Sequence, residues 1–167
     1  MFKLHLTAKL LTAFLLCLNA IHAMALPSDR EQPVNIEADS AEISQLAGQT
    51  IYKGHVKLTQ GSLEISADEI IISVEAGTLR NLVASGQQAS LSQLVNPDKP
   101  VVTATANTIH YDIAEDSLLL EGMANIVHGE SQFEGNRIEY LIKDEKVQAE
   151  ERVRMTIPTA HSSGGNE

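Results

Sequence analysis

The chain has 167 residues, 43% of them hydrophobic, and a net charge of −10 when histidines are counted as neutral. This acidic balance argues against nucleic acid and anionic membrane surfaces as partners, because too few cations are available to neutralise many phosphates. The length is that of one domain with room for a hydrophobic core, and the single cysteine precludes an internal disulfide.

Residues 1–25 have the pattern of a secretory signal peptide. Lys3 and Lys9 supply a positive start, residues 10–18 form a short apolar run, and Ala23-Met24-Ala25 fits an A-x-A cleavage site. We expect cleavage after Ala25. A retained anchor is the alternative, although the apolar run is short for a membrane span. Because both lysines leave and all acidic residues stay, the mature chain would carry a net charge of −12.

The first half of the mature chain alternates apolar and polar side chains, which is the period of β-strands with one buried face. Residues 54–68 predict a β-hairpin, because two alternating arms flank Gln60-Gly61. Gly86 is expected to break a strand. The pattern predicts strands around 34–38, 50–53, 56–60, 63–67, 69–74, 78–85 and 89–94.

A proline-bracketed loop at 95–100 separates this half from a second one with the same alternation. The second half predicts strands around 102–106, 109–113, 117–120, 122–127, 132–135, 138–142 and 152–157. No segment after residue 25 keeps a helical period over three turns. The pattern therefore predicts one all-β domain over 26–158, sandwich-like or barrel-like, followed by a disordered tail at 159–167.

The two halves resemble each other. A shift of 68 positions places Gly54 on Gly122 and Asp68 on Asn136, and the register holds without a gap from 34/102 to 74/142. Because the two halves align without a gap and with their glycines at matching positions, the sequence predicts one β protein built from two similar halves.

No constellation of residues predicts catalysis. Asp68-Glu69 and Glu150-Glu151 are neighbours on strands, so their carboxylates point to opposite faces and cannot act as a pair. The histidines are scattered without metal-ligand spacing, and neither a G-x-S-x-G elbow nor a phosphate-binding glycine loop occurs. We therefore expect neither enzyme activity nor a metal or other cofactor. An enzyme assembled only by folding, or of β-helix type, is the disfavoured alternative.

The joint pattern of several segments resembles the LptA/OstA-like family of periplasmic lipopolysaccharide-transport proteins. The resemblance is carried by Gln32-Pro33-Val34-Asn35-Ile36-Glu37-Ala38-Asp39, by Gly54-x-Val56-x-Leu58-x-Gln60-Gly61 with Ile65-x-Ala67-Asp68, by His110-Tyr111-Asp112, and by Ile138-x-Tyr140-Leu141. It covers nearly all of the mature chain. It implies a twisted, antiparallel, V-shaped β-jellyroll that is open at both ends, located in the periplasm.

The resemblance also implies a groove that carries the acyl chains of lipid A between the membranes. Its matched lining positions are Val34, Ile36, Leu91, Tyr111 and Ile113. The apolar phase of the strands adds Val56, Leu58, Leu63, Ile65, Ile70, Ile72, Phe133 and Tyr140 as candidate groove residues. The ordinary interpretation of each is a core residue, because the apolar phase of a two-sheet protein normally fills its core.

Open ends imply unpaired strands that can add to other strands. The candidate edge residues are Val34, Ile36, Val153, Met155 and Ile157. The resemblance implies an inner-membrane anchored OstA-like partner at the N-terminal edge and an outer-membrane barrel partner at the C-terminal edge. Pairing unlike edges would also give a head-to-tail homo-oligomer. The competing hypothesis is a structural β-module that assembles through its edges and carries no lipid.

Overall fold

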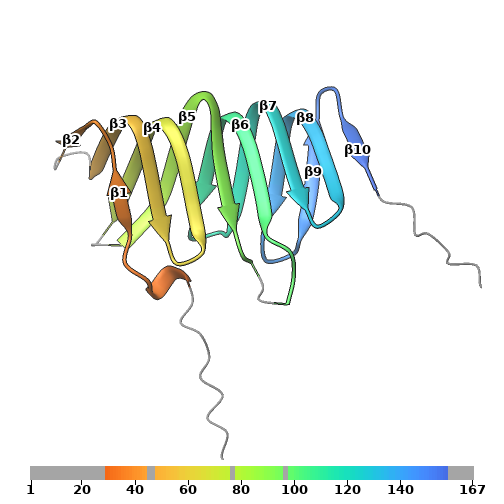
Figure 1. Cartoon of the computed structure of the whole chain (residues 1–167), viewed down its shortest axis with the longest axis horizontal. Helices are drawn as coiled ribbons and strands as arrows, with labels where there is room; N and C mark the ends of the chain where they lie inside the picture. The colour runs from red at the N-terminus through yellow and green to blue at the C-terminus, as the bar shows by residue number, and fades with distance from the viewer. Residues whose placement is uncertain (1–28, 45–47, 76–77, 96–97, 158–167) are drawn as a thin grey trace, which may run out of the picture.

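The computed structural model describes residues 29–44, 48–75, 78–95 and 98–157. The predicted signal peptide (1–25) and tail (159–167) lie outside these residues. Ten antiparallel strands form one sheet, preceded by a 3-10 turn, η2 (Asp29–Glu31) (Figure 1). The strands are β1 (Asn35–Glu37), β2 (Ser40–Ser44), β3 (Gln49–Gln60), β4 (Leu63–Glu75), β5 (Thr78–Gln93), β6 (Val102–Asp112), β7 (Ser117–His128), β8 (Ser131–Leu141), β9 (Lys146–Glu150) and β10 (Arg154–Thr156).

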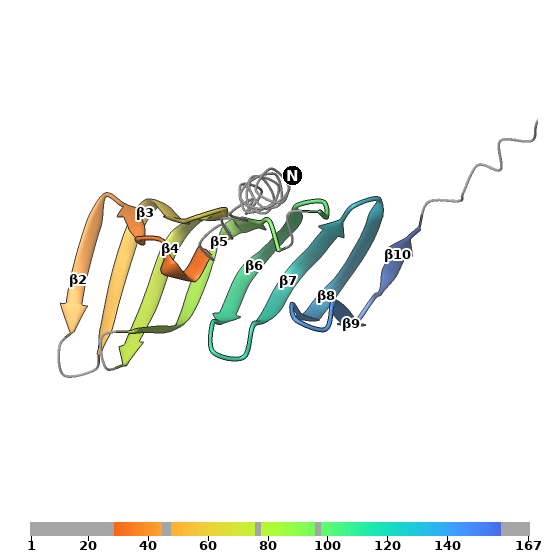
Figure 2. The same cartoon turned by 90° about the horizontal axis from the view of Figure 1, so that it is seen from below.

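Strands that follow each other in sequence lie side by side in the sheet from β3 to β8, so the topology is a meander of antiparallel strands. Each end of the sheet carries two short strands. β1 and β2 both pair with β3, whereas β9 and β10 both pair with β8. The two ends lie at opposite extremes of the long axis (Figures 1 and 2). The sheet is therefore open, as predicted for an all-β jellyroll with two free ends.

A line of β-bulges crosses all the long strands and bends the sheet into a V. On β3, Gly54 and His55 have φ of 81° and 46° where the register with β4 shifts, and Gly122 and Met123 repeat this on β7 with 76° and 49°. Carboxylate or amide side chains face the bulges from the neighbouring strands. We call this line the corner; its residues are Asp39, Gly54, His55, Asp68, Gly86, Gln87, Gln88, Asn107, Gly122, Met123 and Asn136.

Several predicted strand boundaries are wrong at the corner, because strands continue through the bulges there. Gly86 does not end a strand, because β5 runs through it as one bulged strand from Thr78 to Gln93. The predicted pairs of short strands at 102–106 and 109–113 are likewise one strand, β6. The sequence pattern also missed β9, whose alternation of Val147 and Ala149 with charged and polar residues is short.

The predicted similarity of the two halves is confirmed. The shift of 68 positions carries β3 (49–60) onto β7 (117–128), and it carries the partner pair Ile36 and Leu58 onto the pair Ala104 and Ile126. β1 and β2 together match the single strand β6. The corner is thus a repeated structural feature, and its glycines are the ones that align in the sequence.

Candidate functional site

The corner divides the sheet into two walls that face each other. The first wall comprises 40–44, 49–53, 69–75, 79–85, 108–112, 117–121, 137–141 and 146–150, and the second wall comprises 35–37, 56–60, 63–66, 89–93, 102–106, 124–128, 131–135 and 154–156. On either side of the corner, alternation along the strands sends apolar side chains inward from both walls. On β6, buried residues alternate with exposed or intermediate ones except at the bulge. The space between the walls is a continuous apolar interior.

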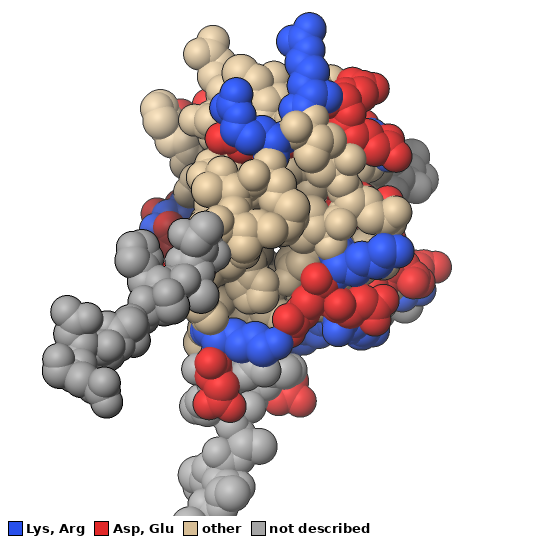
Figure 3. Space-filling model, turned by 90° about the vertical axis from the view of Figure 1, so that its right-hand side faces the viewer, with Lys and Arg blue, Asp and Glu red and all other residues tan. Residues whose placement is uncertain are grey.

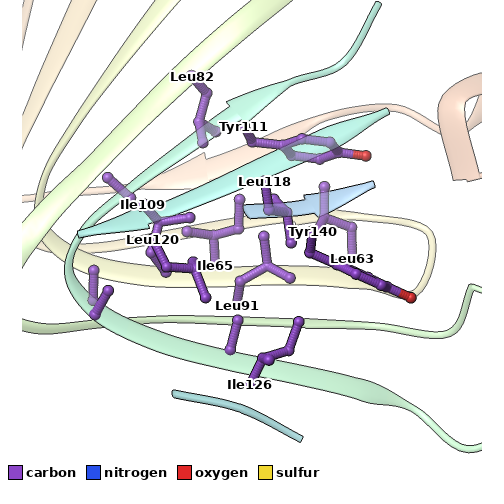
Figure 4. Packing of buried hydrophobic residues seen from close by; sticks show 14 of the residues in the cluster. Leu63, Ile65, Leu82, Leu91, Ile109, Tyr111, Leu118, Leu120, Ile126 and Tyr140 are labelled. Atoms are coloured by element: carbon purple, nitrogen blue, oxygen red, sulfur yellow. The ribbon is translucent and has the colours of Figure 1, made fainter. Parts of the chain in front are cut away.

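The interior holds most of the predicted groove residues. Nine are buried: Val56, Leu58, Leu63, Ile65, Ile70, Ile72, Leu91, Tyr111 and Tyr140, none of them more than 7% exposed. Ile36, Ile113 and Phe133 are partly buried against the same cluster, whereas Val34 is 38% exposed before β1. All but Val34 therefore pack in or against one cluster (Figure 4). Whether any of them contacts lipid stays a prediction.

Other interior residues were not singled out from the sequence. Leu82, Ile109, Leu118, Leu120, Ile126 and Ile138 are each at most 1% exposed, and several lie beside Ile65 and Leu91 (Figure 4). The alternation that placed Ile65 inward applies equally to them, so the signal was present in the sequence. Alanines line the interior near the corner, where the walls converge; they are Ala84, Ala89, Ala104, Ala106 and Ala124.

The interior is filled by the chain's own apolar side chains. No polar or charged residue among the described part of the chain is classed as buried, and the apolar side chains of both walls pack against each other. A cavity of about 420 Å³ lies instead at the corner, lined by polar residues that include His55, Asp68 and Gln87.

The mouth of the V lies opposite the corner, where the turns at the free margins of the two walls meet. Tyr111 on β6 and Tyr140 on β8, with Leu118 of β7 between them in the first wall, point their hydroxyl oxygens to the same side of the cluster (Figure 4). Burial raises the pKa of both phenols. A hydrogen bond involving Gln93 of the second wall and the nearby charge of Arg30 partly offset that rise at Tyr111. The tyrosines therefore mark the boundary between the apolar interior and the charged margins.

The N-terminal turn η2 is fixed to the second wall beside the mouth. Asp29 accepts a hydrogen bond from the backbone amide of Ser62 at 2.9 Å, and the amide side chain of Gln60 donates to the carbonyl of Gln32 at 3.0 Å. These contacts hold Arg30 over the mouth, where it pairs with Asp116 in the β6–β7 turn of the first wall. Lys99, in the β5–β6 loop at the margin of the second wall, similarly pairs with Glu145 in the β8–β9 turn. Two ion pairs thus join the walls across the mouth.

Sequence reasoning missed these charged residues. Arg30 and Asp116 are 86 positions apart, and Lys99 and Glu145 are 46 apart, so only the topology brings them together. Their sole signal in the sequence is that each lies in or beside a turn, where charged residues are common.

The predicted edge residues lie at the two ends of the sheet. β1 and β10 each pair on one side only, and Val153, Met155 and Ile157 are 53%, 51% and 61% exposed. Seen from the β10 end, uncharged side chains fill the centre and charged ones lie towards the periphery (Figure 3). The end that offers an unpaired strand therefore has an uncharged centre and a charged periphery.

Among the described residues, no group of three or more His, Cys, Asp or Glu side chains could hold a metal ion, and no helix there is long and apolar enough to cross a membrane. An antiparallel sheet folded over a continuous apolar interior, polar outside and unpaired at both ends, defines the class: an open β-jellyroll.

The comparisons with known proteins identify the family within this class. A family model described as LptA/(LptD N-terminal domain) LPS transport protein matches residues 35–146. The lipopolysaccharide export system protein LptH of Pseudomonas aeruginosa is 33% identical over 135 residues, covering 80% of this chain and 77% of that protein. The corresponding protein LptA of Escherichia coli K12 is 32% identical over 146 residues, covering 86% and 78%. The chain belongs to this LPS transport protein family.

A solved structure agrees with the fold. The crystal structure of Pseudomonas aeruginosa LptH matches with a TM-score of 0.74 at 30% identity, covering 80% of this chain and 100% of that one. LptH is described there as the LptA homologous periplasmic component of the conserved lipopolysaccharide transport device. The predicted family and the predicted all-β jellyroll fold are therefore confirmed.

Proposed function

We propose that this chain is a periplasmic lipopolysaccharide-binding transport protein that shelters lipid A acyl chains between its two walls. The observation that carries the proposal is the apolar interior, which runs through the sheet from β3 to β8 and has no buried charge among the described residues. The names of the relatives, which are lipopolysaccharide export proteins rather than enzymes, support it.

The energetics favour such a role. Exposing an acyl chain to water costs about 0.8 kcal/mol per CH₂, so a chain of ~12 carbons presents on the order of 10 kcal/mol that an apolar interior can offset. Contacts of this kind lack direction, so a chain can slide along the interior. The interior residues pack together in this conformation, and bound lipid would replace wall-to-wall contacts with wall-to-lipid contacts of the same chemistry.

We also propose that the free ends join copies of the chain head to tail. The internal repeat supplies a register for this contact. Met155 pairs with Phe133 as Leu91 pairs with Ile65, so β10 occupies the place of the second-wall part of β5. Because Leu91 pairs with Ala104 and Ile36 is the counterpart of Ala104, Met155 of one copy is expected opposite Ile36 of the next.

The same register gives complementary neighbours along the rest of the edge. In the repeat, Arg154 is equivalent to Ser90 and Glu37 is equivalent to Thr105. Because Ser90 pairs with Thr105, the cation of Arg154 in one copy is expected opposite the carboxylate of Glu37 in the next. In the first wall, Val147 takes the place of Leu82 and faces Ile43, which is 71% exposed in the single chain. Copies joined in this way would align their interiors into one apolar path.

The two unpaired ends also suit a protein that connects components of the inner and outer membranes. We propose that the β1–β2 edge pairs with an inner-membrane anchored OstA-like partner and the β9–β10 edge with an outer-membrane barrel partner. Strand addition supplies backbone hydrogen bonds, and side chains such as Ile36 and Met155 supply specificity. The energy for directional transport would then come from other components.

Lipid extraction from the purified mature chain tests the proposal. Protein produced in cells that make lipopolysaccharide should yield that lipid on solvent extraction, quantified by mass spectrometry. Ile113→Asp places a charge beside the interior and should lower the yield, since burying an unpaired charge is costly. Ala114→Asp is the matched control, because Ala114 is exposed in the next turn position and should leave the yield unchanged. Folded protein without lipid would favour the structural module that carries no cargo.

A further inference from the structure

One carboxylate at the mouth lies between two cations. The guanidinium of Arg30 pairs with one oxygen of Asp116, and the Nζ atom of Lys143 lies 3.5 Å from the other. The Asp116 side chain is only 15% exposed, although it belongs to a surface turn. The arrangement is a small anion site that an acidic side chain of the protein itself occupies.

A second site of the same kind lies farther along the mouth. Lys99 pairs with Glu145, and this contact lowers the pKa of the Glu145 carboxyl. Glu145 is the last residue of the β8–β9 turn, just as Asp116 is the last residue of the β6–β7 turn. The two carboxylates therefore occupy equivalent places in successive turns on the same margin.

A buried hydroxyl without a partner lies beside this second site. Tyr140 is 1% exposed, and its hydroxyl oxygen has no hydrogen-bond partner. Tyr140 lies near the end of β8, just before the turn that carries Glu145, and the charge of that carboxylate adds to the effect of burial in raising the pKa of the phenol. A buried hydroxyl left unpaired costs about 1–3 kcal/mol, which a ligand oxygen that accepts from it would recover.

The cations at the mouth differ from those on the outer faces. Lys53 and Lys57 pair with Glu69 and Glu64 on the adjacent strand, within one wall. By contrast, the pairs of Arg30 and Lys99 join the margins of the two walls at the mouth. Cations so placed lie where the polar part of a lipid would emerge if its acyl chains lay inside.

We propose that Arg30, Lys99 and Lys143, together with the Tyr140 hydroxyl, bind the phosphates of the headgroup of a bound lipid. In the structure, Asp116 and Glu145 pair with these cations and join the two margins of the mouth. A phosphate carries more charge and more acceptor oxygens than a carboxylate, so it displaces them when the walls part. The inference rests on the proposed function and adds headgroup recognition to it, at a local cluster of cations in an otherwise acidic protein.

Binding of lipid A to the mature chain, compared with binding of the same lipid stripped of its phosphates, tests this inference. The double variant Arg30→Gln with Lys143→Gln should bind intact lipid A about tenfold or more weakly, the range for lost contacts between charged groups. Its affinity for the stripped lipid should not change. The matched control, Lys53→Gln with Lys57→Gln, removes the same charge from an outer face and should preserve both affinities.

Asp116→Asn provides a result that misfolding could not produce. Removing the internal competitor should tighten binding of intact lipid A and leave the stripped lipid unaffected. Equal effects on both lipids, or an equal loss in the outer-face control, would overturn the headgroup site while leaving lipid carriage intact. Inorganic phosphate bound as tightly as lipid A would also overturn it. Failure of the unaltered chain to bind either lipid would instead refute the proposed function.

Discussion

At the scale of single residues, the corner depends on glycines that face polar side chains at short range. A Cβ atom built on Gly122 would lie 2.7 Å from the side-chain nitrogen of Asn107, and one on Gly54 would lie 2.2 Å from a carboxylate oxygen of Asp39. Asp39 also accepts from Nδ1 of His55 at 2.9 Å, which raises the pKa of that imidazole. Both glycines have positive φ, so the backbone conformation and the close approach each disfavour a side chain.

Replacing Gly122 by Ala tests whether the close approach at the corner costs more stability than a positive φ alone does in an ordinary turn. We expect a loss of unfolding free energy of about 2–4 kcal/mol, since a left-handed alanine costs about 1–2 kcal/mol and the contact with Asn107 adds to it. Gly129→Ala is the matched control, because Gly129 also has positive φ (62°) but its Cβ would lie at an ordinary 3.4 Å from Pro100. Urea denaturation of both variants measures the difference. An equal loss would show that the close approach at the corner contributes nothing.

At the scale of strands, alternation in the sequence was sufficient to predict the buried face of the central hairpin formed by β3 and β4. Leu58 and Ile65 were expected inward and Lys57 and Glu64 outward, and the structure agrees. Strand ends were harder to predict. A glycine that ends a strand and a glycine that bulges within one have the same local sequence, and only the pairing of both flanks with the neighbouring strand distinguishes them, as at Gly86.

The candidate site was predictable to the same extent. The interior residues follow from alternation, and the resemblance to the family added Leu91 and Tyr111. The charged mouth did not follow, because Arg30 meets Asp116 only after six strands have placed two distant turns together. Pairing across a folded sheet leaves no periodic trace in the sequence.

The edge strands carry a prediction about assembly that depends on the internal repeat. The one cysteine, Cys17, lies in the predicted signal peptide. In a chain that begins at Leu26, Ile36→Cys and Met155→Cys, prepared separately and mixed under oxidising conditions, should therefore form a disulfide-linked dimer. Glu37→Cys mixed with Met155→Cys is the control, because residue 37 points to the other face of β1. Non-reducing electrophoresis reads the outcome. Equal amounts of disulfide-linked dimer in both mixtures would contradict the register.

Deletion of 152–167 should also abolish self-association of the chain without introduced cysteines, as measured by light scattering across a concentration series.

At the scale of the whole molecule, one folded sheet combines three properties that suit transport between membranes. Its interior is apolar, its mouth is held by two ion pairs that need no covalent change to open, and its ends are unpaired strands. The ends differ in sequence, so contact between them need not close into a ring and can extend the assembly in one direction. The central claim is that lipid travels through the interior rather than over the outer faces.

Photo-crosslinking in cells that make lipopolysaccharide tests that claim most directly. A crosslinking side chain placed at Ile36, Tyr111 or Ile113 lies at the interior cluster, whereas one at Lys57 or His110 lies on an outer face. We predict that lipopolysaccharide is captured from the three interior positions and not from the two outer ones. Capture of equal strength from both groups would contradict the account.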